Sequence, residues 1–238
     1  MDPGAVQDIC RGSVVEIRIH VSGGILPIGG VIVKFESNFL YIISHKHHIE
    51  QRISNSDLVL GFIDGTEVVI ANDKITTLDD NFLGIACVLD DGIDTSHIKA
   101  VNFDEQKLRH GASVWTYSFH MYILPADLTD GFVSRTEDMF FYHTCRGGIR
   151  LLTKHGAPVF NKHGQLVGLC HDEHCSVLVA STVSSIAQSL CRGHGTDNMG
   201  INEILQHIYD STMAQNGKAR EQNKSLVGGQ PFSQGDDQ

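Results

Sequence analysis

The stretch Thr153-Lys154-His155-Gly156-Ala157-Pro158-Val159-Phe160-Asn161 decides the fold of this 238-residue chain. It lies between two apolar runs, and a Lys-His-Gly turn at 162–164 follows it. The string Leu166-Val167-Gly168-Leu169 then reads as a β-strand, because a short apolar run bounded by turn residues is typical of a buried strand. The stretch therefore predicts a polar turn around His155 that leads into short strands.

The first half of the chain repeats this succession of strands and turns. The run at 13–21 (SVVEIRIHV) alternates apolar and polar residues, which is the pattern of a half-buried strand. The runs at 31–35 and 39–43 are β-branched and aromatic, and the residues 36–38 between them predict a turn. Asp64-Gly65 is a favoured two-residue hairpin turn between two further apolar runs. Many short strands joined in this way indicate an all-β domain.

The composition agrees with such a domain and excludes two classes of partner. A chain with 41% hydrophobic residues and 24 glycines can bury a full core within one domain of ordinary length. The formal net charge is −10, whereas non-specific binding to nucleic acids or anionic membranes needs a basic face. We therefore expect neither a nucleic acid nor a membrane as a partner.

The start of the chain and the spacing of its cysteines indicate in which cellular compartment the protein is expected. Residues 1–11 (MDPGAVQDICR) contain neither a basic segment nor an apolar one, so a secretory signal is not expected. No apolar run approaches the roughly 18 residues that a membrane helix needs. The six cysteines lack the dense spacing of a disulfide scaffold: Cys10, Cys87, Cys145, Cys170, Cys175 and Cys191. These features predict a reduced setting, the cytoplasm or the nucleus.

The order of these turns and strands resembles the trypsin-like serine peptidases, specifically their Do-like (HtrA) branch. In that family a Gly-Asn-Ser-Gly-Gly-Pro-type turn leads into an apolar strand, a further strand and a final helix. Pro158 matches the proline of that turn, and Gly156-Ala157 match its two glycines. His155 then stands where the family has its nucleophilic serine. The resemblance implies an all-β fold of two six-stranded antiparallel β-barrels with short C-terminal helices.

The resemblance covers residues 12–191 and divides them into a first barrel at 12–104 and a second at 105–191. A short capped helix is expected at 182–190, where the family also has a helix. A second helix is predicted at 199–213 from a stripe of apolar residues at helical spacing: Ile201, Ile204, Leu205 and Ile208. Residues 214–238 are rich in Gln, Gly and Ser and are predicted to be a disordered tail after it.

The catalytic positions of the family are altered in this chain. His47 follows a predicted strand at the place of the family's general base. Phe82 takes the place of the aspartate that orients that base, and Thr153 replaces a glycine of the oxyanion loop. Together with His155, these substitutions imply that the catalytic site of the family is not intact. A shift of register would bring Asp79 or Asp80 to the aspartate position, and this alternative stays open.

Two cysteine-containing segments offer other possible sources of chemistry. Cys145 is the thiol nearest to the loop before His155, but a buried cysteine more often behaves as a small hydrophobe than as a nucleophile. The string at 170–175 offers four side chains of types that bind Zn²⁺: Cys170, His171, His174 and Cys175. Six consecutive residues at a hairpin tip cannot all converge on one ion. We therefore expect a polar turn with cysteines on the flanking strands, and neither a metal nor a cofactor.

These observations predict a pseudoprotease: a trypsin-like domain without peptidase activity that acts as a protein-binding or regulatory module. The alternative is an active peptidase or another hydrolase with a rearranged catalytic site. The partner is expected to be another protein, bound through the cleft or through the 199–213 helix. The apolar stripe of that helix must dock on the chain's own barrels or on a partner. Because 182–190 already fills the place of the family's final helix, the second helix is predicted to contribute to self-association, as a homo-oligomer, or to a partner interface.

Overall fold

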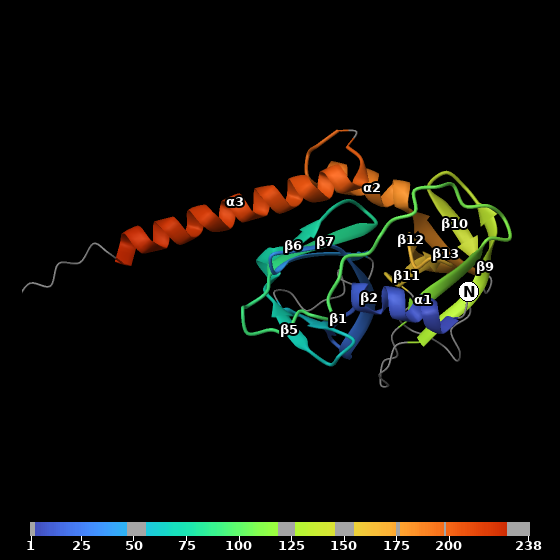
Figure 1. Ribbon diagram of the computed structural model, residues 1–238, viewed down its shortest axis with the longest axis horizontal. Helices are drawn as coiled ribbons and strands as arrows, with labels where there is room; N and C mark the ends of the chain where they lie inside the picture. The colour runs from blue at the N-terminus through green and yellow to red at the C-terminus, as the bar shows by residue number, and fades with distance from the viewer. Residues whose placement is uncertain are drawn as a thin grey trace, which may run out of the picture.

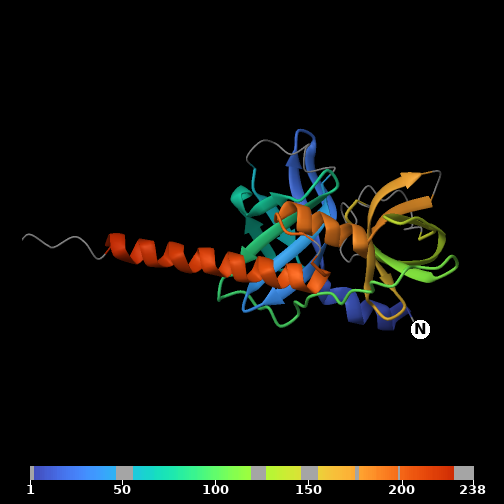
Figure 2. The same cartoon turned by 90° about the horizontal axis from the view of Figure 1, so that it is seen from above.

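The computed structural model describes residues 3–46, 56–118, 127–145, 155–174, 177–197 and 199–227. Two β-sheets lie side by side, with α1 (Pro3–Cys10) and α2 (Val183–Gly193) packed against them (Figure 1). The helix α3 (Ile201–Val227) lies along the first sheet and projects past it (Figure 2). No described helix is both long enough and apolar enough to span a bilayer.

The first sheet contains seven antiparallel strands in the order β5-β4-β1-β2-β3-β7-β6. Its strands are β1 (Val14–Val21), β2 (Gly24–Glu36), β3 (Phe39–His45), β4 (Leu58–Gly61), β5 (Glu67–Ile70), β6 (Ile75–Thr77) and β7 (Phe82–Val88). Single 3₁₀ turns precede β1 and β6, at Arg11–Ser13 and Asn72–Lys74. Between β2 and β3, Ser37 and Asn38 both have positive φ, +49° and +63°, which is the geometry of a tight two-residue hairpin.

The second sheet closes into a barrel of six strands, in the order β10-β13-β12-β11-β8-β9. These are β8 (Ser113–Ser118), β9 (Asp127–Thr136), β10 (Phe140–His143), β11 (Pro158–Asn161), β12 (Leu166–His174) and β13 (Val177–Thr182). The predicted all-β architecture and the six-stranded second barrel are confirmed. The first sheet departs from the predicted six-stranded barrel, because the short strand β6 adds a seventh strand and the described strands form an open half-barrel.

One hydrophobic core joins both sheets and all three α-helices. It contains Tyr41 from the first sheet, Phe160 from the second, Val6 from α1, Ile186 from α2 and Ile204 from α3. The predicted cap of α2 is confirmed, since the Thr182 hydroxyl accepts a hydrogen bond from the Ser185 N–H at 3.2 Å.

The structure corrects the predicted end of the C-terminal helix and packs the apolar stripe of that helix on the chain's own core. The helix runs to Val227 rather than 213, so the first part of the predicted disordered tail is helical; 228–238 lie outside the described residues. The tail was predicted from its lack of apolar residues, but Ala, Gln, Lys, Arg and Glu are strong helix formers and can extend a helix into solvent. The apolar stripe is covered by the chain's own core, with Ile204 and Ile208 at 0% and 2% exposure. This stripe is therefore not available to a partner in this arrangement.

Candidate functional site

The turn at His155 and Gly156 is wedged between the two sheets. The Gly29 N–H of β2 donates to the His155 carbonyl at 3.1 Å, and the Gly156 N–H donates to the Cys170 carbonyl of β12 at 2.8 Å. Gly156 has φ +75°, and a Cβ there would overlap the Gly29 carbonyl oxygen and the Ser44 hydroxyl. The turn predicted from the sequence is thus fixed by backbone contacts with both halves of the molecule.

Three imidazole rings gather beside this turn. The His45 ring, at the end of β3, has its centroid 6.0 Å from that of His155 and 5.6 Å from that of His171 on β12. The His45 and His171 rings are nearly parallel, at 19°. Phe82 is the Cα partner of His45 across β3 and β7, and the two rings meet edge to face with centroids 6.0 Å apart. His45 is 7% exposed and Phe82 is fully buried, so both rings belong to the interior.

The predicted site residues are only partly brought together in the described structure. His155 and Phe82 both contact the His45 ring. His47 and Thr153 lie outside the described residues. Sequence reasoning missed His45 because it ended the third strand at 43, whereas β3 continues to His45 with every residue buried. If the predicted strand had been extended by two residues beyond 43, it would have included His45.

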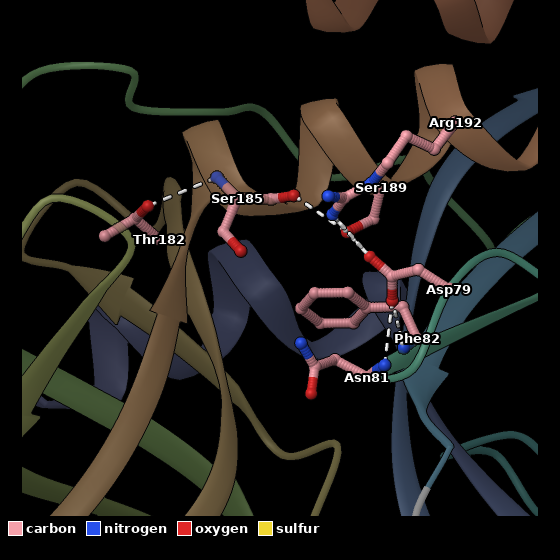
Figure 3. A network of polar contacts seen from close by, with 7 residues as sticks. All are labelled: Asp79, Asn81, Phe82, Thr182, Ser185, Ser189 and Arg192. Carbon is pink, nitrogen blue, oxygen red and sulfur yellow. Dashed lines mark hydrogen bonds and ion pairs between the residues drawn. The ribbon is translucent and has the colours of Figure 1, made fainter.

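The Asp79 carboxylate, the alternative candidate for orienting a histidine, is bound by other donors (Figure 3). One oxygen accepts the Asn81 and Phe82 N–H groups at 2.8 and 3.0 Å. The other accepts the Ser189 hydroxyl and the Arg192 guanidinium of α2, the latter at 2.7 Å. The carboxylate thus links the β6–β7 turn to α2.

Asp80 lies next to that carboxylate in the sequence, and its side chain is exposed. Within the described part of the chain, neither aspartate forms a hydrogen bond or an ion pair with a histidine.

The environment of Asp79 sets its ionisation. Burial raises the pKa of the carboxyl, but hydrogen bonds from Ser189, Asn81 and Phe82 together with the Arg192 charge outweigh burial and lower the pKa below 3.8. A lowered pKa in the folded state means that the ionised carboxylate stabilises the fold above pH 3.8 and that this contribution is lost as the pH falls through the lowered value.

Asp79→Ala should therefore lower the free energy of unfolding by about 2 kcal/mol at pH 7, because it leaves buried donors without an acceptor. The Arg192 side chain is 60% exposed, so its ion pair contributes little of this. Urea unfolding at pH 7 and below pH 3 measures the effect, which should shrink at the lower pH. Asp80→Ala is the matched control, and an equal loss in both variants would contradict the role of the Asp79 network.

Cys145 is embedded in the second barrel. It is 1% exposed, and its thiol donates to the Val114 carbonyl at 3.4 Å. Burial raises the pKa of this thiol to about 11. A thiol that stays protonated at neutral pH is a poor nucleophile. These properties fit the interpretation of Cys145 as a small buried hydrophobe.

The predicted turn at 170–175 is a strand as far as His174, where β12 ends; β13 begins at Val177, and 175–176 lie outside the described residues. Cys170 and His171 have different partners. The Cys170 sulfur lies 3.3 Å from His143 Nε2, and His171 Nδ1 lies 3.1 Å from the Ser181 hydroxyl oxygen.

Among the described residues, no group of three or more His, Cys, Asp or Glu side chains is arranged to hold a metal ion. The side chain of His174 and the whole of Cys175 lie outside the described part. The two pairs, Cys170–His143 and Ser181–His171, were not anticipated from the sequence, since each joins residues of different strands.

A scan against models of protein families finds no match, and a comparison with curated proteins finds none either. The solved structures that resemble this chain include the HtrA-type protease AlgW with tripeptide, at a TM-score of 0.63 and 11% identity. They also include the serine endoprotease from Yersinia pestis, at a TM-score of 0.60 and 14% identity. The chain has the trypsin-like fold of HtrA-type proteases.

A variant of AlgW with tripeptide matches at a TM-score of 0.62 and 11% identity. The matches to the two AlgW structures cover 82% of this chain, and the match to the Yersinia protein covers 79%. In each case only 65% of the other protein's chain is matched. At these identities the likeness extends to the fold, and the activity of those proteases is not carried over with it.

Proposed function

We propose that this trypsin-like domain is catalytically inactive and acts by binding another protein. The observation that supports this is the composition of the cluster at the inter-sheet turn. Where the resemblance places a serine hydroxyl and an aspartate, the chain has the imidazole of His155 and the phenyl ring of Phe82. A phenyl ring cannot accept the N–H of an imidazole, so it can neither orient a general base nor stabilise its protonated form.

Protein binding is the activity that such a domain retains when the chemistry is lost. The trypsin-like fold presents strand edges and surface loops, and extended peptides add readily to strand edges. The chain is acidic, with a formal net charge of −10, which favours a protein partner over a nucleic acid. Residence in the cytoplasm or nucleus and assembly into a homo-oligomer stay predictions.

A second candidate function is a hydrolase with a rearranged site, and one contact favours it. The Ser181 hydroxyl oxygen lies 3.1 Å from His171 Nδ1, a distance at which an imidazole can take a proton from a hydroxyl. Against this candidate, Ser181 is only 5% exposed, so a substrate would have to displace neighbouring side chains to reach it.

A fluorophosphonate probe separates the two functions. The purified protein is expected to show neither covalent labelling nor turnover of casein. His155→Ser alone should also remain inactive, because loss of the orienting aspartate costs about 10⁴ in kcat even where the geometry is kept. Mass spectrometry of the intact protein measures labelling, and an active HtrA protease serves as the positive control.

Labelling that disappears in Ser181→Ala would establish the hydrolase in place of the inactive module. Turnover by His155→Ser would contradict the assignment of Phe82 to the aspartate position.

A further inference from the structure

A groove of about 830 Å³ lies between α3 and the first sheet, away from the inter-sheet turn. The sheet contributes Thr76 of β6 and Ala86 and Val88 of β7, and α3 contributes Ser211, Thr212 and Gln215. Figures 1 and 2 show that α3 continues past β6 and β7 at this end of the sheet. The volume is large enough for several residues of a peptide, so the groove is more than a packing defect.

The groove exists because the side of α3 that faces the sheet changes character along the helix. Ile204 and Ile208 are fully buried and pack on the core. One turn further on, Ser211, Thr212 and Gln215 line the groove together with the apolar side chains of Ile208 and Met213. Short polar side chains neither fill the space above the sheet nor drive its closure. The helix is thus held over the sheet without covering it.

Beside this groove β6 pairs with only part of β7, and the 3₁₀ turn Asn72–Lys74 that leads into β6 lies near β7. The pairing of β6 with β7 ends at Ile75 and Ile85, whereas β7 continues to Val88 and pairs there with Phe39 of β3. The next N–H, that of Leu89, donates toward β3, to Asn38 O at 2.8 Å. Since successive residues of a strand direct their N–H and C=O groups to opposite sides, those of Val88 face the groove.

Val88 also exposes 38% of its surface and lines the groove. The backbone groups of Val88 can therefore pair with an extended segment that enters the groove.

Charge selects the kind of segment that fits. Three charged side chains line the groove: Asp73, Lys74 and Asp91. Lys74 Nζ lies 3.2 Å from the Asp73 carboxylate. Asp91 accepts a hydrogen bond from the Asn38 amide at 3.3 Å and has no ion-pair partner in the described part of the chain. The groove therefore carries an uncompensated negative charge at Asp91, which complements a cationic side chain.

We propose that this groove binds an extended peptide segment of a partner protein, which pairs with the end of β7 and places a Lys or Arg side chain on Asp91. Backbone hydrogen bonds to Val88 supply the affinity for an extended chain, and the cation supplies selectivity. This site is separate from the His45–His155–His171 cluster, so the proposal holds whether or not that cluster is catalytic.

A fluorescein-labelled hexapeptide of alternating Thr and Val with one central Lys is the probe. We expect saturable binding to the full chain by fluorescence anisotropy. Thr212→Trp fills the groove from the helix side and should weaken binding at least about tenfold, which corresponds to 1.4 kcal/mol. Ala214→Trp is the matched control, because Ala214 is exposed on the same helix and does not line the groove. Circular dichroism verifies that both variants are folded.

Two further arms test the chemistry of recognition. Asp91→Asn should weaken binding of the Lys peptide roughly two- to fivefold, as loss of an exposed ion pair does, and leave a Gln-substituted peptide unaffected. A peptide with N-methylated backbone on the pairing edge should not bind. Absence of saturable binding at about 1 mM peptide, or equal binding by Thr212→Trp, overturns the proposal.

Other occupants of the groove would be revealed by the same measurements. If a chain ending at Val227 binds the probe at least about tenfold tighter than the full chain, residues 228–238 are the occupant in place of a partner. If light scattering shows a dimer that Thr212→Trp converts to a monomer, the occupant is a second copy of the chain. Either result overturns the assignment to a partner protein.

Discussion

A chain that ends at Gly195 is expected to lose the cooperative fold of the whole domain. It lacks four side chains of α3 that are at most 3% exposed: Ile201, Ile204, Leu205 and Ile208. Burial of each is worth roughly 1.5–3 kcal/mol, or about 6–12 kcal/mol together. The total stability of a domain is typically about 5–15 kcal/mol, so a loss of this size removes most of it. Thermal unfolding followed by circular dichroism measures the loss.

A chain that ends at Gly217 is the matched control for this truncation. It keeps the four buried side chains and the edge-to-face contact of Tyr209 with Phe39, whose ring centroids are 5.3 Å apart. Residues 218–227, the described part of the segment that it removes, extend past the first sheet, and the Lys218 side chain is exposed. Its melting temperature should lie within a few degrees of the full chain's.

The opposite outcome is equally specific. If the chain ending at Gly195 keeps the melting temperature of the full chain but has a smaller mass by light scattering, the apolar stripe covers a second copy. The helix would then be an assembly element, as the sequence alone predicted.

The strands of this domain could be predicted because their signals are local. The alternation at 13–21 becomes β1, and the two-residue turn Ser37–Asn38 lies within the predicted 36–38. The turn around His155 was predicted from a proline and small residues in a fixed order, and the structure places a turn there. In each case the residues that determine the conformation are neighbours in the chain.

The contacts of the site could not be predicted in this way. The Asp79 carboxylate meets Ser189, 110 positions further on, and nothing near Asp79 in the sequence signals that α2 will pass over it. The His45 and His171 rings likewise stack only because β3 and β12 pack together across the two sheets. An isolated sequence identifies the residue at a family position, but the partners of that residue depend on tertiary packing.

The length of α3 was underestimated for a related reason. A stripe of apolar residues predicts where a helix packs, and the predicted helix ended at 213, soon after the last residue of the stripe, Ile208. The helix continues beyond the sheet to Val227. In that part the intrinsic helix propensity of the residues, and not packing on the sheet, determines that the chain is helical. The groove beside Thr212 arises at this transition, so a pattern of apolar residues alone could not reveal it.

Gly156→Ala is expected to destabilise the domain by about 2–5 kcal/mol. Two costs add: an alanine at φ +75° costs about 1–2 kcal/mol, and its Cβ would overlap the Gly29 carbonyl oxygen, which forces an overpacking shift of about 1–3 kcal/mol. The carbonyl cannot rotate away, because it belongs to β2 and accepts the Ser44 hydroxyl at 2.5 Å. Urea unfolding of the purified variant measures the difference.

Comparison with Gly111→Ala separates the steric overlap from the conformational cost. Gly111 has φ +79°, almost the value of Gly156, and a Cβ there would meet nothing within 4 Å. This control should lose only the conformational part, about 1–2 kcal/mol. If Gly156→Ala costs no more than Gly111→Ala, the turn can move away from β2, and the two sheets are not held together at His155 as closely as the backbone contacts indicate. A larger loss in Gly156→Ala identifies this turn as the contact that requires glycine, whether or not the domain is a peptidase.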